Sequence, residues 1–277
     1  MKKIMIVFAM LYTGCIHAST LFSERVTSLL TPESVIQAKN GDLYVSEING
    51  FNQDSDGQIR KITHNGETTI FAKGMDDPKG LAIIGDNVYV ADKNRVLMVM
   101  PNGHWHIFVA ADAFPQTPQF LNDLAADNQG NLYVSDSGDL STGGAIYKIN
   151  PQGRITTIVD RNKPEVLAPN GLFVEDEHHL LTVDFASGML YRVNLDNGDL
   201  VKLAEGFGGG DGIVKTKSGQ IYVSDWKGGS IYLLDAGQAR PIKSHFNSPA
   251  DIALSHDEKY ILVPVMKAGT LEFIEID

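Results

Sequence analysis

One short phrase recurs six times along the chain, and its regular spacing is the feature that most limits the fold. The phrase joins an apolar run to an acidic residue, as in Gly-Asn-Leu-Tyr-Val-Ser-Asp (130–136). At intervals of 39 to 48 residues, its copies end at Glu47, Asp92, Asp136, Asp184, Asp225 and, in degraded form, Pro264. That period is typical of one four-stranded propeller blade. The sequence therefore predicts an all-β fold, a six-bladed β-propeller.

The rest of each unit also reads as β-structure. A second apolar run follows the phrase, and in several units an Asn-Gly turn comes next, as at Asn65-Gly66, Asn102-Gly103 and Asn197-Gly198. Such turns connect hairpin strands because they need positive φ angles. No helical period extends over 11 or more residues. A two-sheet sandwich, the rival all-β fold, does not explain so long and regular a repeat.

The last unit is one strand short. It stops at residues 270–276, which form its third strand, whereas residues 20–29 precede the first unit and belong to no blade. We expect this N-terminal segment to supply the missing outer strand of the last blade. That pairing closes the ring and removes exposed sheet edges.

The N-terminus has the order of an export signal. Lys2 and Lys3 precede an apolar stretch that is too short to span a bilayer stably, and small or polar residues follow to Ala18. We expect a signal peptide over residues 1–18, a propeller domain over 19–277, and a periplasmic or secreted protein without a transmembrane segment. Thr13-Gly14-Cys15 also resembles a lipid-attachment box, so a lipid anchor at Cys15 is the alternative.

Composition excludes several functions. Cys15 is the only cysteine, so a mature chain that starts at residue 19 has no disulfide, thiol nucleophile or Cys-ligated metal. The formal net charge of −11, without a basic run, argues against nucleic acid as a partner. We expect a small-molecule substrate. The repeated acidic residues end strands, where a carboxylate can accept hydrogen bonds from turn N–H groups, so we interpret them as structural.

A column of polar residues lies 13 or 14 positions before these strand ends. Its members are Glu33, Lys79, Asn122, Asn170, Asp211 and Asp251. Each falls at the start of a strand whose antiparallel neighbour ends at the acidic column. Because the first strand of a propeller blade lines the central channel, the six side chains should converge at one channel mouth. The alternative is that they simply face channel water.

The donor types favour a hard cation. Glu33, Asn122, Asn170 and Asp211 all offer oxygen, which suits Ca²⁺, Mg²⁺ or Mn²⁺. Two carboxylates roughly 5 Å apart repel by about 3 kcal/mol at an effective dielectric near 20, and a divalent ion reverses that cost. We expect one divalent cation, with Ca²⁺ first, then Mg²⁺ or Mn²⁺. Zn²⁺ remains possible, although the column holds no His to favour it.

Three short sequence motifs resemble those of the senescence-marker-protein/gluconolactonase/luciferin-regenerating-enzyme-like family of six-bladed propellers. They are Leu167-Ala-Pro-Asn-Gly-Leu172, Leu121-Asn-Asp-Leu-Ala125 and Gly210-Asp-Gly-Ile213. The resemblance implies that Glu33, Asn170 and Asp211 bind one divalent metal, which polarises a lactone carbonyl. It also implies that Asp211 is the catalytic base and that Asn122 contacts a metal-associated water or the substrate.

The chain departs from the family pattern at two points. Many relatives have Arg two residues before the Asn-Asp motif, where this chain has Phe120. The replacement of Arg by Phe favours a more apolar substrate than a sugar-acid lactone. The motif that enters the first blade is Pro32-Glu33-Ser34-Val35, where relatives more often have Glu-Gly-Pro. Lys79 could replace some of the missing positive charge and bind substrate, although a lysine at a channel edge is more often solvated surface.

Together these features predict a metal-dependent hydrolase of a lactone or related small ester, acting at the channel mouth. The alternative is a non-catalytic propeller that binds a protein or glycan through its loop face. A lyase or synthase that uses the same channel without metal is a third hypothesis. The Gly/Ser-rich loop 137–144 lies on the face of the polar column and could cover a substrate.

Overall fold

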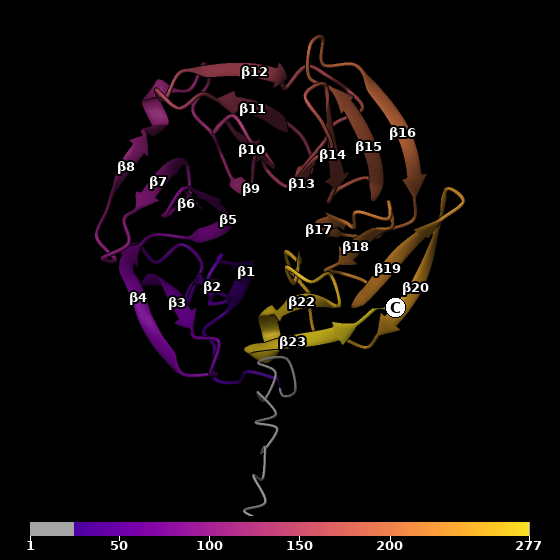
Figure 1. The fold of residues 1–277 in the computed structure, drawn as a ribbon. Helices are drawn as coiled ribbons and strands as arrows, with labels where there is room; N and C mark the ends of the chain where they lie inside the picture. The colour runs from indigo at the N-terminus through magenta and orange to yellow at the C-terminus, as the bar shows by residue number, and fades with distance from the viewer. Residues whose placement is uncertain (1–24, 277) are drawn as a thin grey trace, which may run out of the picture.

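The computed structural model describes residues 25–276, which form six antiparallel sheets in a ring around a central axis (Figure 1). Five sheets have four strands and the sixth has three. The predicted six-bladed β-propeller is confirmed. The expected signal peptide, residues 1–18 with Cys15, lies outside the described residues.

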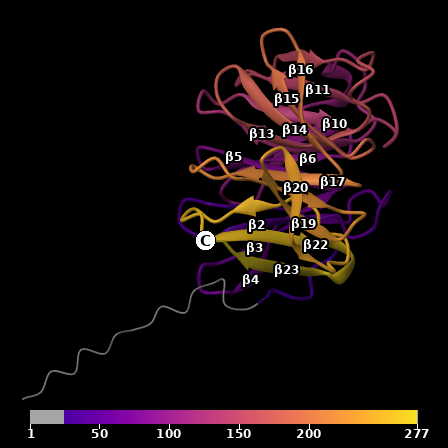
Figure 2. The same cartoon turned by 90° about the vertical axis from the view of Figure 1, so that its right-hand side faces the viewer.

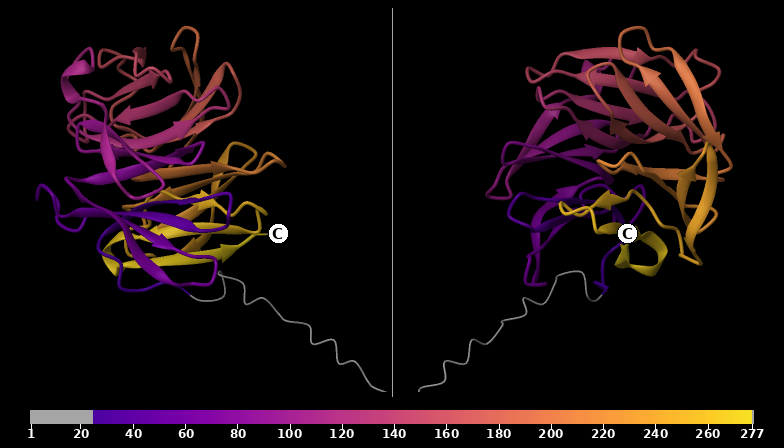
Figure 3. Two further views of the ribbon diagram at one scale, coloured as in Figure 1. Left: turned by 60° about the vertical axis from the view of Figure 1, so that its left-hand side comes forward. Right: turned by 45° about the vertical axis from the view of Figure 1, so that its right-hand side comes forward.

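Within each blade the strands follow chain order from the axis outward, and side views show their loops on the two faces of the ring (Figures 1, 2 and 3). The innermost strands are β1 (Pro32–Gln37), β5 (Pro78–Ile84), β9 (Leu121–Ala126), β13 (Pro169–Val174), β17 (Gly210–Lys215) and β21 (Ala253–Leu254). The second strands are β2 (Leu43–Glu47), β6 (Asn87–Asp92), β10 (Leu132–Asp136), β14 (His179–Asp184), β18 (Ile221–Asp225) and β22 (Tyr260–Val265).

The outer half of each blade is a hairpin that closes the repeat. The third strands are β3 (Gly57–Ile62), β7 (Arg95–Val99), β11 (Ala145–Ile149), β15 (Met189–Asn194), β19 (Ser230–Asp235) and β23 (Thr270–Glu275). The fourth strands are β4 (Thr68–Met75), β8 (Trp105–Val109), β12 (Ile155–Val159), β16 (Leu200–Glu205) and β20 (Gln238–Ser244).

The hydrophobic core is divided among the interfaces between neighbouring blades. Six clusters of buried apolar side chains fill these interfaces, one for each pair of adjacent sheets. Between the first two blades, for example, Ile59 packs with Val90 and Leu97, all fully buried. Alternate residues of each strand face opposite sides of its sheet, so every blade contributes to two clusters.

The ring closes where the two ends of the described chain meet. Val26 exchanges two backbone hydrogen bonds of 2.9 Å with Leu271 of β23, and the Leu29 N–H donates to the Gly269 carbonyl at 3.0 Å. The N-terminal segment therefore takes the outer position of the last blade, as predicted. Within the described residues the pairing is one isolated bridge, and residues 20–24 of the expected strand lie outside them. Leu29 is buried against Leu262 and Leu271, which adds apolar contact to the closure.

The acidic residues that end the second strands anchor the innermost strands. Asp92 accepts the N–H groups of Asp76 and Asp77, both at 2.9 Å, just before β5 begins. Asp136 binds Phe120 N–H at 2.8 Å before β9 in the same way. The structural interpretation of this column is confirmed. By fixing where each inner strand starts, these carboxylates position the polar column beside the channel.

No helix in residues 25–276 has the length and apolar character needed to cross a membrane.

Candidate functional site

A bulge near the start of each inner strand turns the polar column toward the channel mouth. In the first blade Pro32 pairs with Glu47, and the next paired residues are Val35 and Val45, so β1 carries one extra residue. The same shift occurs in β5, β9, β13 and β17. Bulges redirect side chains in this way. The residue after the first pair in each of the five strands is a member of the polar column.

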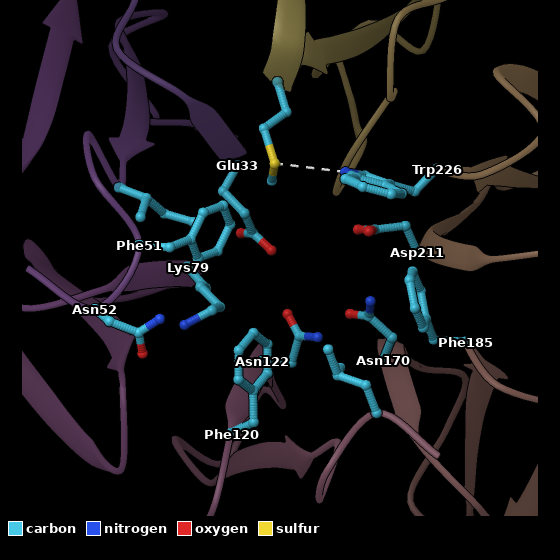
Figure 4. A pocket seen from close by; sticks show the side chains of 13 residues that line it. Glu33, Phe51, Asn52, Lys79, Phe120, Asn122, Asn170, Phe185, Asp211 and Trp226 are labelled. Atoms are coloured by element: carbon cyan, nitrogen blue, oxygen red, sulfur yellow. Dashed lines mark hydrogen bonds between the residues drawn. The ribbon is translucent and has the colours of Figure 1, made fainter.

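These five side chains line one cavity of about 340 Å³. Figure 4 shows Glu33, Asn122, Asn170 and Asp211 converging from separate blades around its centre, with Lys79 at the side and its ammonium group turned away from the centre. All are buried, with at most 4% of their surface exposed: Glu33, Lys79, Asn122, Asn170 and Asp211. The structure thus brings together every residue for which the sequence suggested a metal-binding, catalytic or substrate-binding role. The roles themselves remain predictions.

The sixth member of the column, Asp251, does not line the cavity. The innermost strand of its blade, β21, begins only at Ala253, so Asp251 lies in the segment before the strand. Its carboxylate accepts a 2.5 Å hydrogen bond from the Ser34 hydroxyl and interacts with Asp123. The expectation that all six side chains converge at the mouth is wrong for this residue. Pro249 pairs with Val265 as Pro32 pairs with Glu47, so Ala250 takes the column position and Asp251 lies one residue further along the chain.

Asp251 and Asp123 form a buried acidic pair that the sequence did not reveal. Asp123 accepts the Leu124 and Leu172 N–H groups, both at 2.6 Å. Burial raises the pKa of Asp251 to about 7, and burial with the charge of Asp251 raises the pKa of Asp123 well above its usual range. The Asn-Asp motif placed Asp123 beside the site, but the approach of Asp123 to Asp251 depends on the shape of the whole ring.

In the described part of the chain, seven buried side-chain polar atoms have no hydrogen-bond partner, and three of them are oxygens that face the cavity. They are Oε2 of Glu33, Oδ1 of Asn170 and Oδ1 of Asp211. Buried polar atoms in folded proteins are nearly always satisfied, so each exception needs an explanation. Here the three exceptions that face the cavity coincide with the three residues expected to bind a metal. Figure 4 shows the oxygens of these three side chains directed toward the same central space.

The electrostatics of this group also fit a cation. Burial, followed by the charges of Asp211 and Asp251, raises the pKa of Glu33 well above its usual range. Burial and Asp251 raise the pKa of Asp211, which a hydrogen bond from Asn170 partly offsets. Lys79 lowers the pKa of Glu33 but does not cancel this rise. Two crowded buried carboxylates are costly when ionised, and a divalent cation relieves both desolvation and repulsion. The donor set is therefore suited to a hard, oxygen-binding cation.

An amide oxygen is essential to such a site. The described residues contain no group of three or more His, Cys, Asp and Glu side chains placed to hold a metal. A site at the channel mouth must instead combine the carboxylates of Glu33 and Asp211 with the Asn170 carbonyl. Such all-oxygen sets are more typical of Ca²⁺ and Mg²⁺ than of Zn²⁺.

Asn122 is held in a defined orientation. Its Nδ2 donates to the Ser137 hydroxyl at 3.0 Å, and Ser137 donates in turn to the Pro169 carbonyl at 2.8 Å. The amide oxygen of Asn122 is thereby left facing the cavity (Figure 4). Ser137 is fully buried and begins the loop 137–144, from which Leu140 reaches the cavity. The expected proximity of this loop to the site is confirmed.

Lys79 is buried, in contrast to the solvated alternative. Only 1% of its surface is exposed. Its Nζ donates to the Asp77 carbonyl at 3.1 Å and lies 4.2 Å from the centroid of the Phe120 ring. Burial lowers the pKa of this amine, while Glu33 opposes the shift. An ammonium group has three N–H donors, so Lys79 has donors to offer a bound molecule.

Above the polar floor, the cavity wall is apolar. Six side chains from the connecting loops form this wall, here called the apolar collar: Phe51, Phe120, Leu140, Phe185, Trp226 and Met266. Phe185 and Trp226 make an edge-to-face contact with centroids 6.1 Å apart, and Trp226 Nε1 donates to Met266 Sδ at 3.4 Å (Figure 4).

Sequence reasoning found only part of the collar. Phe120 stood out as a departure from a family pattern, and Leu140 lies in the loop that was expected near the site. The repeat could have identified two more collar residues, because Phe185 and Trp226 each directly follow the acidic residue that ends a second strand. In the first blade Ile48 has the same position and also lines the cavity. Met266 directly follows Val265, the end of the second strand in the last blade, and so has this position too. Phe51 lies at no repeated position.

Comparison with known proteins identifies the family. The profile described as the SMP-30/Gluconolactonase/LRE-like region matches residues 31–263, which is most of the chain. No protein with a curated description matches the sequence.

Solved structures share the fold at low sequence identity. A gluconolactonase from Xanthomonas campestris superposes with a TM-score of 0.73 and 15% identity, covering 93% of this chain and 89% of its own. A candidate gluconolactonase gives 0.72 and 16%, with 92% and 90% covered. An inactive variant of virginiamycin B lyase from Staphylococcus aureus gives 0.63 and 14%, with 92% and 99% covered. At these identities the similarity establishes the fold only.

Proposed function

Because the chain belongs to the SMP-30/gluconolactonase/LRE-like family, we propose that it is a metal-dependent hydrolase of a lactone or related small ester. Membership in the family supports a lactonase-like hydrolase, and the residues at the channel mouth support the metal dependence. Glu33, Asn170 and Asp211 would hold the cation, while Asn122 and Lys79 would contact the substrate.

One observation carries this proposal. The three side chains that would hold a metal each present a buried oxygen without a hydrogen-bond partner to the same cavity. A water-filled channel of structural origin would not require buried, unpartnered oxygens on three separate blades. A bound divalent cation would satisfy all three and would supply a Lewis acid that polarises the substrate carbonyl.

Asp211 is the residue best placed to move a proton. Its carboxylate lines the cavity, where Oδ1 has no hydrogen-bond partner among the described residues, so it can accept a proton from a water bound there. In the proposed reaction Asp211 accepts a proton from the attacking water as the new C–O bond forms. It returns that proton to the ring oxygen when the ester C–O bond breaks, and the product is a hydroxy acid.

Asn122 and Lys79 have complementary tasks. The Asn122 amide donates to Ser137, so the oxygen that faces the cavity can only accept a hydrogen bond, which suits orientation of the attacking water. Lys79 can only donate, and its ammonium suits the carbonyl oxygen that gains negative charge. Its burial strengthens such an interaction because water is excluded.

The oxygen-only donor set leads us to propose Ca²⁺ as the ion, with Mg²⁺ or Mn²⁺ as the next candidates. We further propose a periplasmic or secreted location, on the basis of the charged and then apolar order of residues 1–18. A calcium-binding enzyme is compatible with those compartments.

Hydrolysis before and after chelation tests the proposed function. Purified protein should open members of a broad lactone panel, lose this activity with a chelator and regain it with Ca²⁺. The Asp211→Asn variant should lose at least about 100-fold in kcat, as expected when a general base is removed. A non-catalytic propeller would hydrolyse nothing, and the binding of its partner would be indifferent to chelator.

A further inference from the structure

The apolar collar indicates a more specific class of substrate than the family name does. We infer that the collar selects lactones or esters with an apolar substituent and disfavours the polyhydroxylated lactones of sugar acids. This inference rests on the proposed function, because it concerns the substrate of the same site.

The side chains of the collar lie around the polar floor in Figure 4 and line the same cavity. A lactone carbonyl that reaches Asn122 and Lys79 must therefore leave the rest of the molecule between Phe51, Phe185 and Trp226. The cavity volume of about 340 Å³ is at the small end of the range for ligand sites, roughly 300 to 1,000 Å³. A bound substituent would thus contact several collar side chains at once.

Hydroxyl groups would find few partners in this space. Among the cavity-lining residues above the floor, only Asn52 has a polar side chain. Of the floor residues, three would be engaged by the cation, which leaves Asn122 and Lys79 for the whole substrate. Each hydroxyl buried without a partner should lower affinity by roughly 5-fold to 150-fold. Each buried methylene should instead raise it by about 4-fold.

The aromatic part of the collar is fixed before any ligand binds. Lys227 Nζ lies 4.1 Å from the Phe185 centroid, and Lys267 Nζ lies 4.2 Å from the Trp226 centroid. Together with the contact between the two rings, these cations restrain the aromatic side chains. A preorganised wall gives more selectivity than a flexible one because less entropy is lost on binding.

A series of γ-lactones tests the inference. We expect kcat/KM to rise by about 4-fold per methylene from a methyl to a propyl to a pentyl substituent. Glucono-1,5-lactone should react at least 100-fold more slowly than the pentyl compound. The inference is overturned if glucono-1,5-lactone matches the pentyl compound, or if the alkyl series shows no slope while hydrolysis proceeds.

Two variants distinguish an effect of the collar on substrate preference from a general loss of activity. Trp226→Ala should lower kcat/KM at least 10-fold for the pentyl lactone and less than 3-fold for the methyl lactone. The matched control is Ile107→Ala, because Ile107 is 46% exposed on the outer strand β8 and does not line the cavity. Ile107→Ala should change kcat/KM for neither the pentyl nor the methyl lactone. An equal loss on both substrates in Trp226→Ala would contradict a selective collar.

A binding measurement keeps the inference separate from the proposed function. The chain has two tryptophans, so Trp105→Phe leaves Trp226 as the sole fluorescent reporter inside the collar. Titration with γ-alkyl lactams, which resist hydrolysis, should show tighter binding of the pentyl than of the methyl compound. If this preference appears without any lactone hydrolysis, the hydrolase proposal fails and the collar inference stands. Equal affinities for the two lactams would overturn the collar inference alone.

Discussion

The side chain of Asn122 donates a hydrogen bond of 3.0 Å to the Ser137 hydroxyl, which ties the first strand of the third blade to the loop that contributes Leu140 to the cavity wall. The bond decides which end of the amide faces the cavity, and therefore whether Asn122 offers an acceptor or a donor there. Ser137 itself is anchored by the Pro169 carbonyl in the next blade. The orientation of one site residue thus depends on two neighbouring blades.

Ser137→Ala should lower kcat by roughly 5-fold to 10-fold, the value of one lost buried hydrogen bond, because the Asn122 amide becomes free to rotate. KM should change less, since the binding groups remain. The control is Ser141→Ala in the same loop, where the side chain is exposed. Steady-state kinetics on the folded fraction provides the measurement. Unchanged kcat with lowered stability would mean that Ser137 is only a packing residue.

Glu33→Gln should have opposite effects on stability with and without Ca²⁺. In chelator at pH 8 the variant should melt at a higher temperature than wild type, because a buried carboxylate with a raised pKa has been removed. In excess Ca²⁺ the order should reverse, since binding at about 100 times Kd adds roughly 2.7 kcal/mol to the wild type.

Calorimetry in both conditions tests this reversal, with Glu67→Gln as the exposed control. A variant that remains more stable than wild type in saturating Ca²⁺ would show that Glu33 does not bind the ion.

The chelated protein should lose stability as the pH rises. The pKa of Asp251 lies at about 7 in the folded protein, above its ordinary value of 3.8. A group with a raised folded pKa stabilises the fold fully below its unfolded pKa, and this contribution disappears as the pH rises through the folded pKa. Stability should therefore decline from about pH 4 through pH 7, and Asp123, whose pKa is also raised, should add to the decline.

Urea unfolding in chelator between pH 4.5 and 8.5 measures this slope. Asp251→Asn should flatten it, because the amide does not titrate. A slope that is the same in wild type and variant would mean that the buried acidic pair does not control the pH response.

Ring closure depends on the close approach of Gly269 to Leu29. A Cβ on Gly269 would lie 2.6 Å from the Leu29 carbonyl oxygen, and its φ is +63°. Gly66, in a hairpin turn with φ of +85°, has no atom within 4 Å of the same position. Gly269→Ala should therefore destabilise the protein more than Gly66→Ala, by at least about 1 kcal/mol, because only the former adds a clash to the backbone strain.

The difference between the two variants in chemical denaturation isolates the closure. Equal losses of unfolding free energy would indicate that the Leu29 segment contributes nothing to holding the ring together.

The repeat predicted the fold because a blade is a local unit. Each second strand ends in a carboxylate such as Asp92 or Asp136 that binds the start of its own inner strand, so a spacing of 13 or 14 residues sufficed to find the site. The meeting of Glu33, Asn170 and Asp211 followed from the ring symmetry implied by the repeat and from the family resemblance.

What the sequence concealed depends on departures from that symmetry. Asp251 fits the spacing of the repeat in sequence, but the pairing of Pro249 with Val265 places Ala250 at the column position and Asp251 beside Ser34. The burial of Lys79 depends on the Phe120 ring and on loops from other blades. Phe51 lies in the loop between β2 and β3, at a position that the other blades do not repeat.

The central claim is that Glu33, Asn170 and Asp211 hold one divalent cation. The most direct test is anomalous diffraction from crystals of the protein grown with Mn²⁺ as a stand-in for Ca²⁺. The account predicts a single strong peak at the channel mouth, within about 2.0 to 2.6 Å of an oxygen from each of the three side chains. An empty channel mouth at saturating Mn²⁺, or a peak that none of the three oxygens contacts, would contradict it.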